Sequence, residues 1–138
     1  MGRILAIDYG LKRTGLAVSD PLQIIAGALD TVETKRLEAW IAEYISKNSV
    51  ETIVVGKPTQ MSGAPSQSWQ YIEPFVAKLK QSYPAIKVEL HDERFTSKMA
   101  QRTILESGIG KMARRDKALV DKVSATIILQ SYMQSGSF

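Results

Sequence analysis

The chain has 138 residues, of which 44% are hydrophobic and 23% are charged, and it contains no cysteine. This length and composition are typical of a globular protein, so we expect residues 1–138 to form a single domain. The absence of cysteine excludes disulfide bonds, thiolate catalysis and cysteine-based zinc sites. The single histidine, His91, excludes a metal site built from several histidines.

The charge and hydropathy of the chain indicate whether nucleic acid or a membrane could be its partner. Lysine and arginine number 18 against 14 acidic residues, giving a net charge of +4. This excess is compatible with a nucleic-acid partner, and equally with an ordinary solubility charge. No apolar run approaches the roughly 20 residues of a membrane-spanning helix, and no signal-peptide cleavage site follows the first apolar segment. We therefore expect a cytoplasmic protein with no membrane contact.

Three strand-like segments open the chain. Arg3–Asp8, Thr14–Ser19 and Ile24–Thr31 are rich in aliphatic and β-branched residues, and short connections containing Gly10 and Asp20 join them. Short connections of this kind predict an antiparallel meander of three strands.

Helical and strand-like segments then alternate. Apolar residues at the i, i+3, i+4 spacing predict helices over Leu37–Ile45 and Trp69–Leu79. Pro74 should kink the second helix or mark where its regular part begins. The β-branched run Glu51–Gly56 and the segment Ile86–Leu90 predict two further strands, the first buried on both faces.

Two more helices complete the chain. Thr96 or Ser97 can cap a helix that runs to Gly108, and a final helix is expected over Ala118–Met133. The order βββαβαβα predicts an α/β fold with a mixed five-stranded sheet. In this sheet an antiparallel three-strand meander is continued by two parallel strands, and helices flank it.

Carboxylates stand at the ends of two predicted strands. Asp8 ends the first strand, and Asp92 and Glu93 end the fifth. Open α/β proteins place their sites at the C-terminal ends of strands, although Asp8 can also serve a turn. Because neighbouring side chains of a strand alternate, we expect only one of Asp92 and Glu93 to enter a site, and spacing does not choose between them. His91 is interpreted as a strand-end histidine rather than a metal ligand.

Asp121 falls on the apolar face of the last helix. It shares a helical sector with Ala125, Ile128 and Tyr132. A carboxylate turned toward a core is costly unless a metal ion or a basic group compensates its charge. The alternative is a first-turn aspartate stabilised by the helix dipole.

Together these carboxylates predict a site made of oxygen ligands. Such a site suits Mg²⁺ or Mn²⁺ better than zinc. Two such ions, about 3.5–4 Å apart, can activate a water and stabilise the leaving oxygen of a phosphodiester. A site of this kind is compatible with a metal-dependent phosphodiesterase that uses two ions and needs no protein nucleophile.

Four motifs resemble the YqgF/RuvX family of ribonuclease H-like proteins along nearly the whole chain. They are Asp8–Ala17, Val54–Gly56 with Pro58, Met61 and Gly63, His91–Ser97, and Asp121–Ala125. The resemblance implies a ribonuclease H-like fold and a hydrolase acting on phosphodiester bonds. Members of this family are described as Holliday junction resolvases and as nucleases that mature the 5′ end of pre-16S rRNA.

The resemblance also implies which residues act. It makes Asp8, Glu93 and Asp121 the catalytic, metal-binding carboxylates, and so favours Glu93 over Asp92. The chain departs from the family pattern at Lys57, where an apolar residue is usual, and at Pro74, inside a usually uninterrupted helix.

Basic residues flank each of these carboxylates along the chain and are expected to hold a phosphate backbone. A solvated loop is the alternative for those between 111 and 117, and Tyr9 is the one aromatic expected near the site, unless it belongs to the core. The expected nucleic-acid contacts are Lys12, Arg13, Arg94, Lys98, Arg102, Lys111, Arg114 and Arg115.

The function we expect is processing of the 5′ end of pre-16S rRNA during ribosome biogenesis, by a monomer or a homodimer. One alternative is a Holliday junction resolvase acting on four-way DNA, which needs two active sites and hence a dimer. A second is a non-catalytic RNA-binding ribosome-assembly factor. A third is a nucleotide-binding ATPase, because the Asp-x-Gly turn at Asp8 resembles the phosphate loop of actin-like ATPases.

Overall fold

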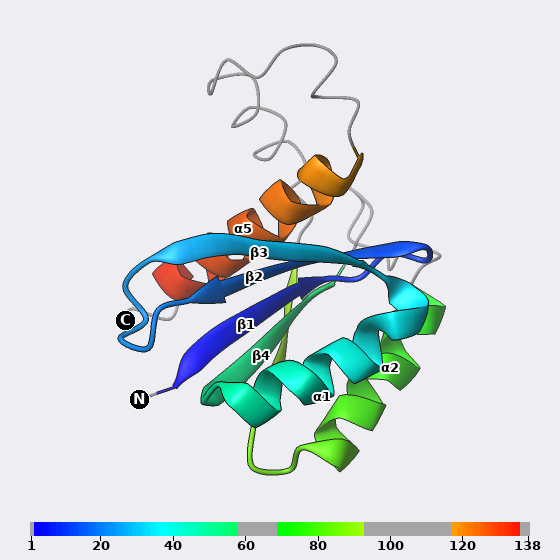
Figure 1. Ribbon diagram of the computed structural model, residues 1–138, viewed down its shortest axis with the longest axis horizontal. Coiled ribbons are helices and arrows are strands. Elements are labelled where there is room, and N and C mark those ends of the chain that lie inside the picture. Colours follow the sequence, from blue (N-terminus) through cyan, green and yellow to red (C-terminus); the bar gives the residue numbers. More distant parts are fainter. Residues whose placement is uncertain (1, 58–68, 93–116, 136–138) are drawn as a thin grey trace.

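The computed structural model describes residues 2–57, 69–92 and 117–135 (Figure 1). For residues 92, 117–123 and 135 it describes the backbone only. The helix expected from Thr96 or Ser97 to Gly108 and the loop around residues 58–66 lie outside the described residues.

A mixed five-stranded sheet forms the centre of the fold, in the order β3-β2-β1-β4-β5. β1 pairs antiparallel with β2, and β2 with β3, whereas β1, β4 and β5 run parallel. This topology confirms the predicted meander continued by two parallel strands. The strands are β1 (Arg3–Asp8), β2 (Arg13–Ser19), β3 (Ala26–Glu33), β4 (Val50–Lys57) and β5 (Lys87–Asp92).

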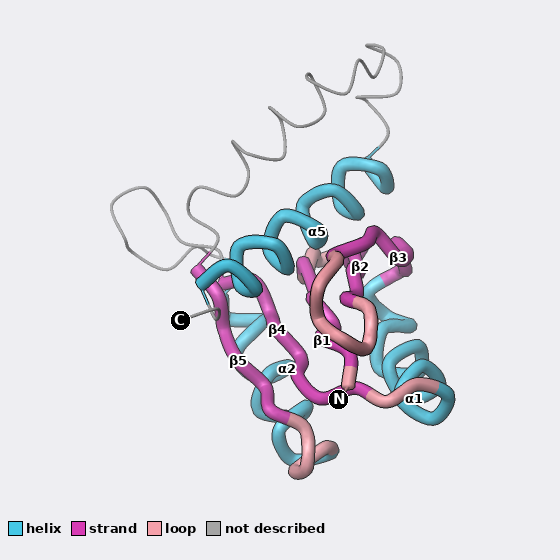
Figure 2. The backbone as a smooth tube through the Cα atoms, turned by 90° about the vertical axis from the view of Figure 1, so that its left-hand side faces the viewer, coloured by secondary structure: helices cyan, strands magenta, loops and turns pink. Residues whose placement is uncertain are grey.

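Helices cover both faces of the sheet (Figures 1 and 2). On one face lie α1 (Leu37–Lys47), which follows the short 3-10 helix η1 (Thr34–Arg36), and α2 (Trp69–Ser82). On the other lies α5 (Lys117–Ser135), which packs against β1, β2 and β3. Among the helices that the structure describes, none has both the length and the apolar character needed to cross a membrane.

The two faces of β1 belong to two different cores. Leu5 and Ile7 are buried against α1 and α2, whereas Ile4 and Ala6 are buried against α5. Successive side chains of a strand point to opposite faces, so the parity of a position tells which layer it meets. This parity places each residue at the end of a strand on one face or the other.

α5 runs in the direction opposite to β1 (Figure 1). Near its C-terminal end, Tyr132 and Met133 line a pocket with Ile4 and Thr52, which lie near the N-terminal ends of β1 and β4. The N-terminal half of α5 therefore extends toward the edge of the sheet where β1 and β4 end.

The third strand begins later than the sequence predicts. It starts at Ala26 rather than Ile24, and the side chains of Ile24 and Ile25 are 69% and 68% exposed. The carboxylate of Asp20 accepts the backbone N–H groups of Ile24 at 2.7 Å and Ile25 at 2.8 Å. The Asp20 side chain therefore holds Ile24 and Ile25 in the turn, where hydrophobic periodicity alone predicts a strand.

Pro74 lies inside α2, with the regular helix beginning before it. The suggestion that Pro74 marks the start of the regular helix is therefore wrong. The residue is on the exposed side of α2, so the hydrogen bond that proline cannot donate is lost where water reaches the backbone.

Candidate functional site

Asp8 is the last residue of β1, as predicted, and lies at the middle of the sheet edge between β2 and β4. It pairs with Gly15 of β2 and is half-buried. Its position has the parity of Ile4 and Ala6, both buried against α5. Asp8 therefore belongs to the α5 face of the sheet at the C-terminal end of the central strand.

Tyr9 lies on the other face. Its ring centroid is 5.0 Å from that of Phe75 in α2, and the two rings are tilted by 39°. Burial raises the pKa of the Tyr9 hydroxyl, with a smaller contribution from the charge of Glu38. Of the two roles considered for Tyr9, the packing supports the core role.

The turn after Asp8 is held in one conformation by its backbone. A Cβ on Gly10 would lie 2.2 Å from the carbonyl oxygen of Arg13, so only glycine fits there. Thr34 Oγ1 donates to the carbonyl of Gly10 at 2.5 Å and accepts from the hydroxyl of Thr14 at 2.9 Å. The Thr34 N–H donates to the carbonyl of Lys12 at 3.0 Å. The start of η1 thus fixes the turn against the sheet.

Two of the eight expected nucleic-acid contacts lie in this turn. Lys12 is exposed and Arg13, the first residue of β2, is half-buried. Both therefore present positive charge within a few residues of Asp8. The other expected contacts lie outside the described residues: Arg94, Lys98, Arg102, Lys111, Arg114 and Arg115.

The parallel strands bring three strand ends to the same edge of the sheet. Ile7 pairs with Val55 of β4, so Asp8 is level with Gly56, and Gly56 pairs with His91 of β5. Two strand spacings separate β1 from β5, which is about 10 Å across the sheet. β5 ends at Asp92, and Glu93 lies outside the described residues.

Side-chain contacts define which positions of β5 meet α5. His91 Nε2 is 2.8 Å from Ser131 Oγ, and its ring packs edge-on against Tyr132. Glu89 accepts a short hydrogen bond from the Tyr132 hydroxyl. Val88, of the other parity, packs against the α1–α2 core. Positions 89 and 91 therefore have the parity of Asp8, toward α5.

The contact between Glu89 and Tyr132 changes the pKa values of both side chains. The hydrogen bond from Tyr132, followed by that from Lys87, lowers the pKa of the Glu89 carboxyl. Burial first, and the Glu89 carboxylate second, raise the pKa of the Tyr132 hydroxyl to about 12. Both shifts favour the state in which a neutral tyrosine donates to a charged carboxylate.

Asp121 lies in the N-terminal half of α5. The side chains of Ala125, Ile128 and Leu129 are fully buried against the sheet. Asp121 is one turn before Ala125 and two turns before Ile128, so its backbone position continues this stripe toward the edge where β1 ends. The prediction that the Ala125–Ile128 stripe is the core face of this helix is confirmed; nothing is described of the Asp121 side chain.

Among the described side chains, no three histidine or acidic residues come together as a metal-binding group. That set includes Asp8 but neither Glu93 nor the side chain of Asp121. The joint metal site therefore stays a prediction.

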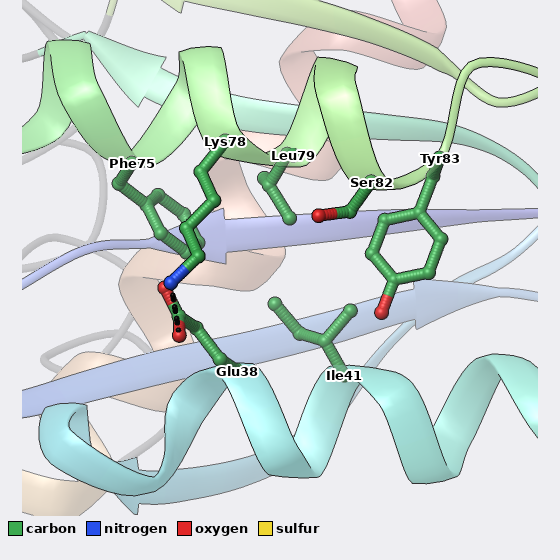
Figure 3. A pocket seen from close by; sticks show the side chains of 7 residues that line it. All are labelled: Glu38, Ile41, Phe75, Lys78, Leu79, Ser82 and Tyr83. Carbon is green, nitrogen blue, oxygen red and sulfur yellow. Dashed lines mark hydrogen bonds and ion pairs between the residues drawn. The ribbon is translucent and has the colours of Figure 1, made fainter.

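A cavity of about 120 Å³ lies between α1 and α2, on the opposite face from Asp8 (Figure 3). An ion pair between Lys78 Nζ and Glu38, 2.9 Å long, spans its mouth, and the aliphatic side chains of Ile41 and Leu79 form its floor. Both charged groups are more than half exposed. This cavity brings no pair of carboxylates together and is not the candidate site.

The sequence analysis names Lys57 only as a departure from the family pattern and not as a cation of the carboxyl edge. Lys57, the last residue of β4, holds its ammonium 5.1 Å from the ring centroid of Trp69 at the start of α2. The available signal was its place directly after Gly56, at the end of a buried parallel strand.

Comparison with known proteins places the chain among nucleases. A family model described as RuvX, Holliday junction resolvase, matches residues 2–135. The chain is 62% identical over 135 residues to a protein of Porphyromonas gingivalis described as "putative pre-16S rRNA nuclease", with 98% of both chains covered. It is 54% identical over 138 residues to a protein of the same description from Bacteroides thetaiotaomicron, with 100% of both chains covered.

Solved structures with the same fold include RuvC of Thermus thermophilus in complex with a Holliday junction substrate. Its TM-score is 0.59 at 19% identity, with 99% of this chain and 98% of RuvC covered. A second structure of Thermus thermophilus RuvC gives a TM-score of 0.57 at 17% identity, with 98% and 97% covered. These similarities confirm the predicted ribonuclease H-like fold.

Proposed function

Because the chain belongs to the RuvX family, we propose that it is a metal-dependent nuclease that processes the 5′ end of pre-16S rRNA during ribosome biogenesis. Residues 1–138 act as one nuclease domain. Asp8, Glu93 and Asp121 hold the metal ions, and the basic residues around them hold the RNA backbone.

The proposal is supported by three features that share one face of the sheet: Asp8 at the end of β1, the odd positions of β5, and the buried stripe of α5. Asp8 ends β1 with the parity that meets α5. Glu89 and His91 contact α5, so a strand that continued one residue past Asp92 would place Glu93 on the same face. Asp121 continues the sheet-facing stripe of α5 in the direction of the same edge. This parity supports Glu93, rather than Asp92, as the ligand from β5.

The donor set fits Mg²⁺ or Mn²⁺. Carboxylate oxygens are the ligands these ions prefer, and the chain has no cysteine. Carboxylates gathered in a partly buried pocket repel one another and lose hydration, so they need divalent positive charge to stay ionised. When bound, a pair of ions supplies an activated water and stabilises the leaving oxygen of the phosphodiester.

The chain's own residues position the substrate. Lys12 and Arg13 lie on the rigid turn after Asp8, so their charges can hold phosphates next to the linkage that is cut. The six expected cations in 93–116 would extend this contact along the backbone. Contacts of this kind fix the register of a nucleic acid but read little sequence.

Four-way DNA is the second candidate substrate. It is favoured by the description of the family model and by the shared fold with RuvC. A four-way junction needs two active sites facing two strands, hence a dimer, whereas trimming one RNA end needs one site. We place rRNA first because the relatives at 62% and 54% identity carry that description.

A cleavage assay with three labelled substrates tests the proposal. Purified protein with Mg²⁺ or Mn²⁺ is offered a pre-16S leader fragment, an unrelated single-stranded RNA and a four-way DNA junction. We expect metal-dependent cleavage of the leader fragment by the wild type and at least a hundred-fold loss in Asp8→Asn and Asp121→Asn, about the 2.7 kcal/mol typical of losing one transition-state contact.

Asp30→Asn provides the matched control. Asp30 lies on the outer strand β3, where its carboxylate accepts the N–H of Thr31 at 2.8 Å, and it pairs with Leu16, which is buried on the α1–α2 face, opposite to the face of Asp8. This variant should cleave like the wild type. Cleavage that survives both Asp8→Asn and Asp121→Asn would place the chemistry elsewhere and overturn the assignment.

Two rival functions are separated by binding measurements. Titration calorimetry should show Mn²⁺ binding that weakens in Asp8→Asn but not in Asp30→Asn; equal binding in all three would favour a non-catalytic RNA-binding factor. Tight, saturable binding of ATP with no cleavage of nucleic acid would favour the ATPase.

A further inference from the structure

Lys57 occupies a position from which it can extend the substrate-binding surface. It is the last residue of β4 and follows Gly56, which is level with Asp8. Its backbone is therefore about 6 Å from that of Asp8, one strand spacing across and one residue along. Its parity is that of Ile53 and Val55, so its side chain belongs to the α1–α2 face.

The aromatic ring beneath this side chain is fixed. Trp69 is half-buried and packs against the α1–α2 core. The Lys57 ammonium lies 5.1 Å from the centroid of its ring, within the range of a cation–π contact. This contact restricts a flexible side chain, so less conformational entropy remains to be lost on binding an anion.

The ammonium is also available for an external anion. Lys35, Lys47, Lys78 and Lys87 each pair with a carboxylate, but no carboxylate among the described side chains lies within ion-pair distance of Lys57. Since the ring of Trp69 is its only partner among the described side chains, this ammonium keeps the capacity to bind a phosphate.

We propose that Lys57 binds a phosphate of the nucleic-acid substrate next to the linkage that is cut, and that Trp69 is the positioning residue that holds it there. This inference rests on the nuclease function proposed above. Because Lys57 and Asp8 belong to opposite faces of the sheet, the phosphate it contacts is a flanking one. Lys57 therefore contributes to binding and register, and the carboxylates to cleavage.

Asp92 offers the competing explanation. It pairs with Lys57 in the parallel register of β4 and β5, so Lys57 can instead serve to neutralise its neighbour. That role predicts a loss of stability, and no change in substrate binding, when Lys57 is replaced. Replacing Lys57 should therefore change substrate binding under the first explanation and the stability of the fold under the second.

The salt dependence of RNA binding distinguishes them. Binding of a single-stranded RNA is measured with EDTA, so that no cleavage occurs, for the wild type and for Lys57→Met, which keeps the length and the contact with the ring. Losing one phosphate contact should reduce the slope of log K against log salt by about 0.7. The affinity ratio of the two proteins should then shrink by about 2.5-fold between 50 and 200 mM salt.

Two further variants complete the design. Lys57→Arg keeps the charge and the stacking and should retain the slope. Lys47→Met, at the far end of α1 where Lys47 pairs with Glu43, should also leave it unchanged. Trp69→Leu should weaken RNA binding when introduced into the wild type. Introduced into Lys57→Met, it should weaken binding little further, since a positioning residue acts only through the group it positions.

Fluorescence gives an independent readout. The chain has two tryptophans, and Trp40→Phe leaves Trp69 alone while preserving an aromatic stack on Tyr44. RNA should change the emission of Trp40→Phe but not that of Trp40→Phe with Lys57→Met. If the wild type binds RNA and Lys57→Met has the same slope and affinity, the inference about Lys57 is wrong and the nuclease proposal stands. If the wild type binds neither RNA nor a four-way DNA junction, both fail.

Discussion

The contact between Thr34 and the turn after Asp8 gives a prediction with a calculable size. Replacing Thr34 with valine keeps the shape of the side chain but removes its hydroxyl. The carbonyl of Gly10 loses its donor and the hydroxyl of Thr14 loses its acceptor. Thr14 is fully buried, so water cannot replace the missing partner there.

The cost follows from how much of this contact is buried. A buried polar group left without a partner costs about 1–3 kcal/mol. Because Thr34 itself is only half-buried, water can reach part of the contact, and we expect about 1–2 kcal/mol for Thr34→Val. For a chain of 138 residues each kcal/mol lowers the melting temperature by about 3.5 °C, so Tm should fall by about 3–7 °C.

A double-mutant cycle is the assay. Stabilities of the wild type, Thr34→Val, Thr14→Val and the double variant are measured by urea unfolding at neutral pH. Since the double variant leaves no unsatisfied Thr14 hydroxyl, it should be more stable than the sum of the single losses predicts, by about 0.5–1 kcal/mol. Additive losses, or a change below about 0.5 kcal/mol in Thr34→Val, would refute the view that this contact holds the turn.

Two further predictions concern pH. Hydrogen bonds from the backbone, the largest from Ile25, lower the pKa of the Asp20 carboxyl below its ordinary 3.8, so its contribution to stability is present above that pH and is lost as the pH falls. The gap in Tm between the wild type and Asp20→Asn should therefore close in acid, and a gap that does not depend on pH would contradict this. The pKa of Tyr132, raised by burial and by Glu89 from 10.0 to about 12, gives a contribution present below pH 10 and lost between pH 10 and 12. Urea midpoints should fall more steeply over that range in the wild type than in Tyr132→Phe; equal slopes would mean that the hydroxyl titrates normally.

The layout of the sheet was predictable from the sequence because it depends on local patterns. The first strand was predicted to the residue, and the order of antiparallel and parallel pairs was correct. The predicted start of β3 was wrong. Ile24 and Ile25 have the apolar character of strand residues, but their backbone N–H groups donate to the Asp20 carboxylate instead of to a neighbouring strand. A side chain that competes for backbone donors leaves no trace in hydrophobic periodicity.

The carboxylates of the candidate site stay a prediction, and the sequence could not tell which face of the sheet they would share. Alternation predicted that the side chains of Asp92 and Glu93 point to opposite faces, yet it could not say which face α5 covers. The contact of Lys57 with Trp69 was likewise invisible, because it joins residues from different elements through tertiary packing. Sequence patterns tell which positions of a strand share a face, and only the packing of the helices tells which helix covers that face.

The register of β5 therefore links the stability of the fold to the composition of the site. Because side chains alternate with a period of two, a shift of one residue between β4 and β5 would move the odd positions of β5 to the α1–α2 face and Asp92 to the α5 face. The hydrogen bonds of Glu89 with Tyr132 and of His91 with Ser131 oppose such a shift, since both require odd positions of β5 to meet α5. In the proposed site, these contacts at the C-terminal end of α5 would thus help to select which carboxylate of β5 accompanies Asp8, although they lie several turns away from the Asp121 position on the same helix.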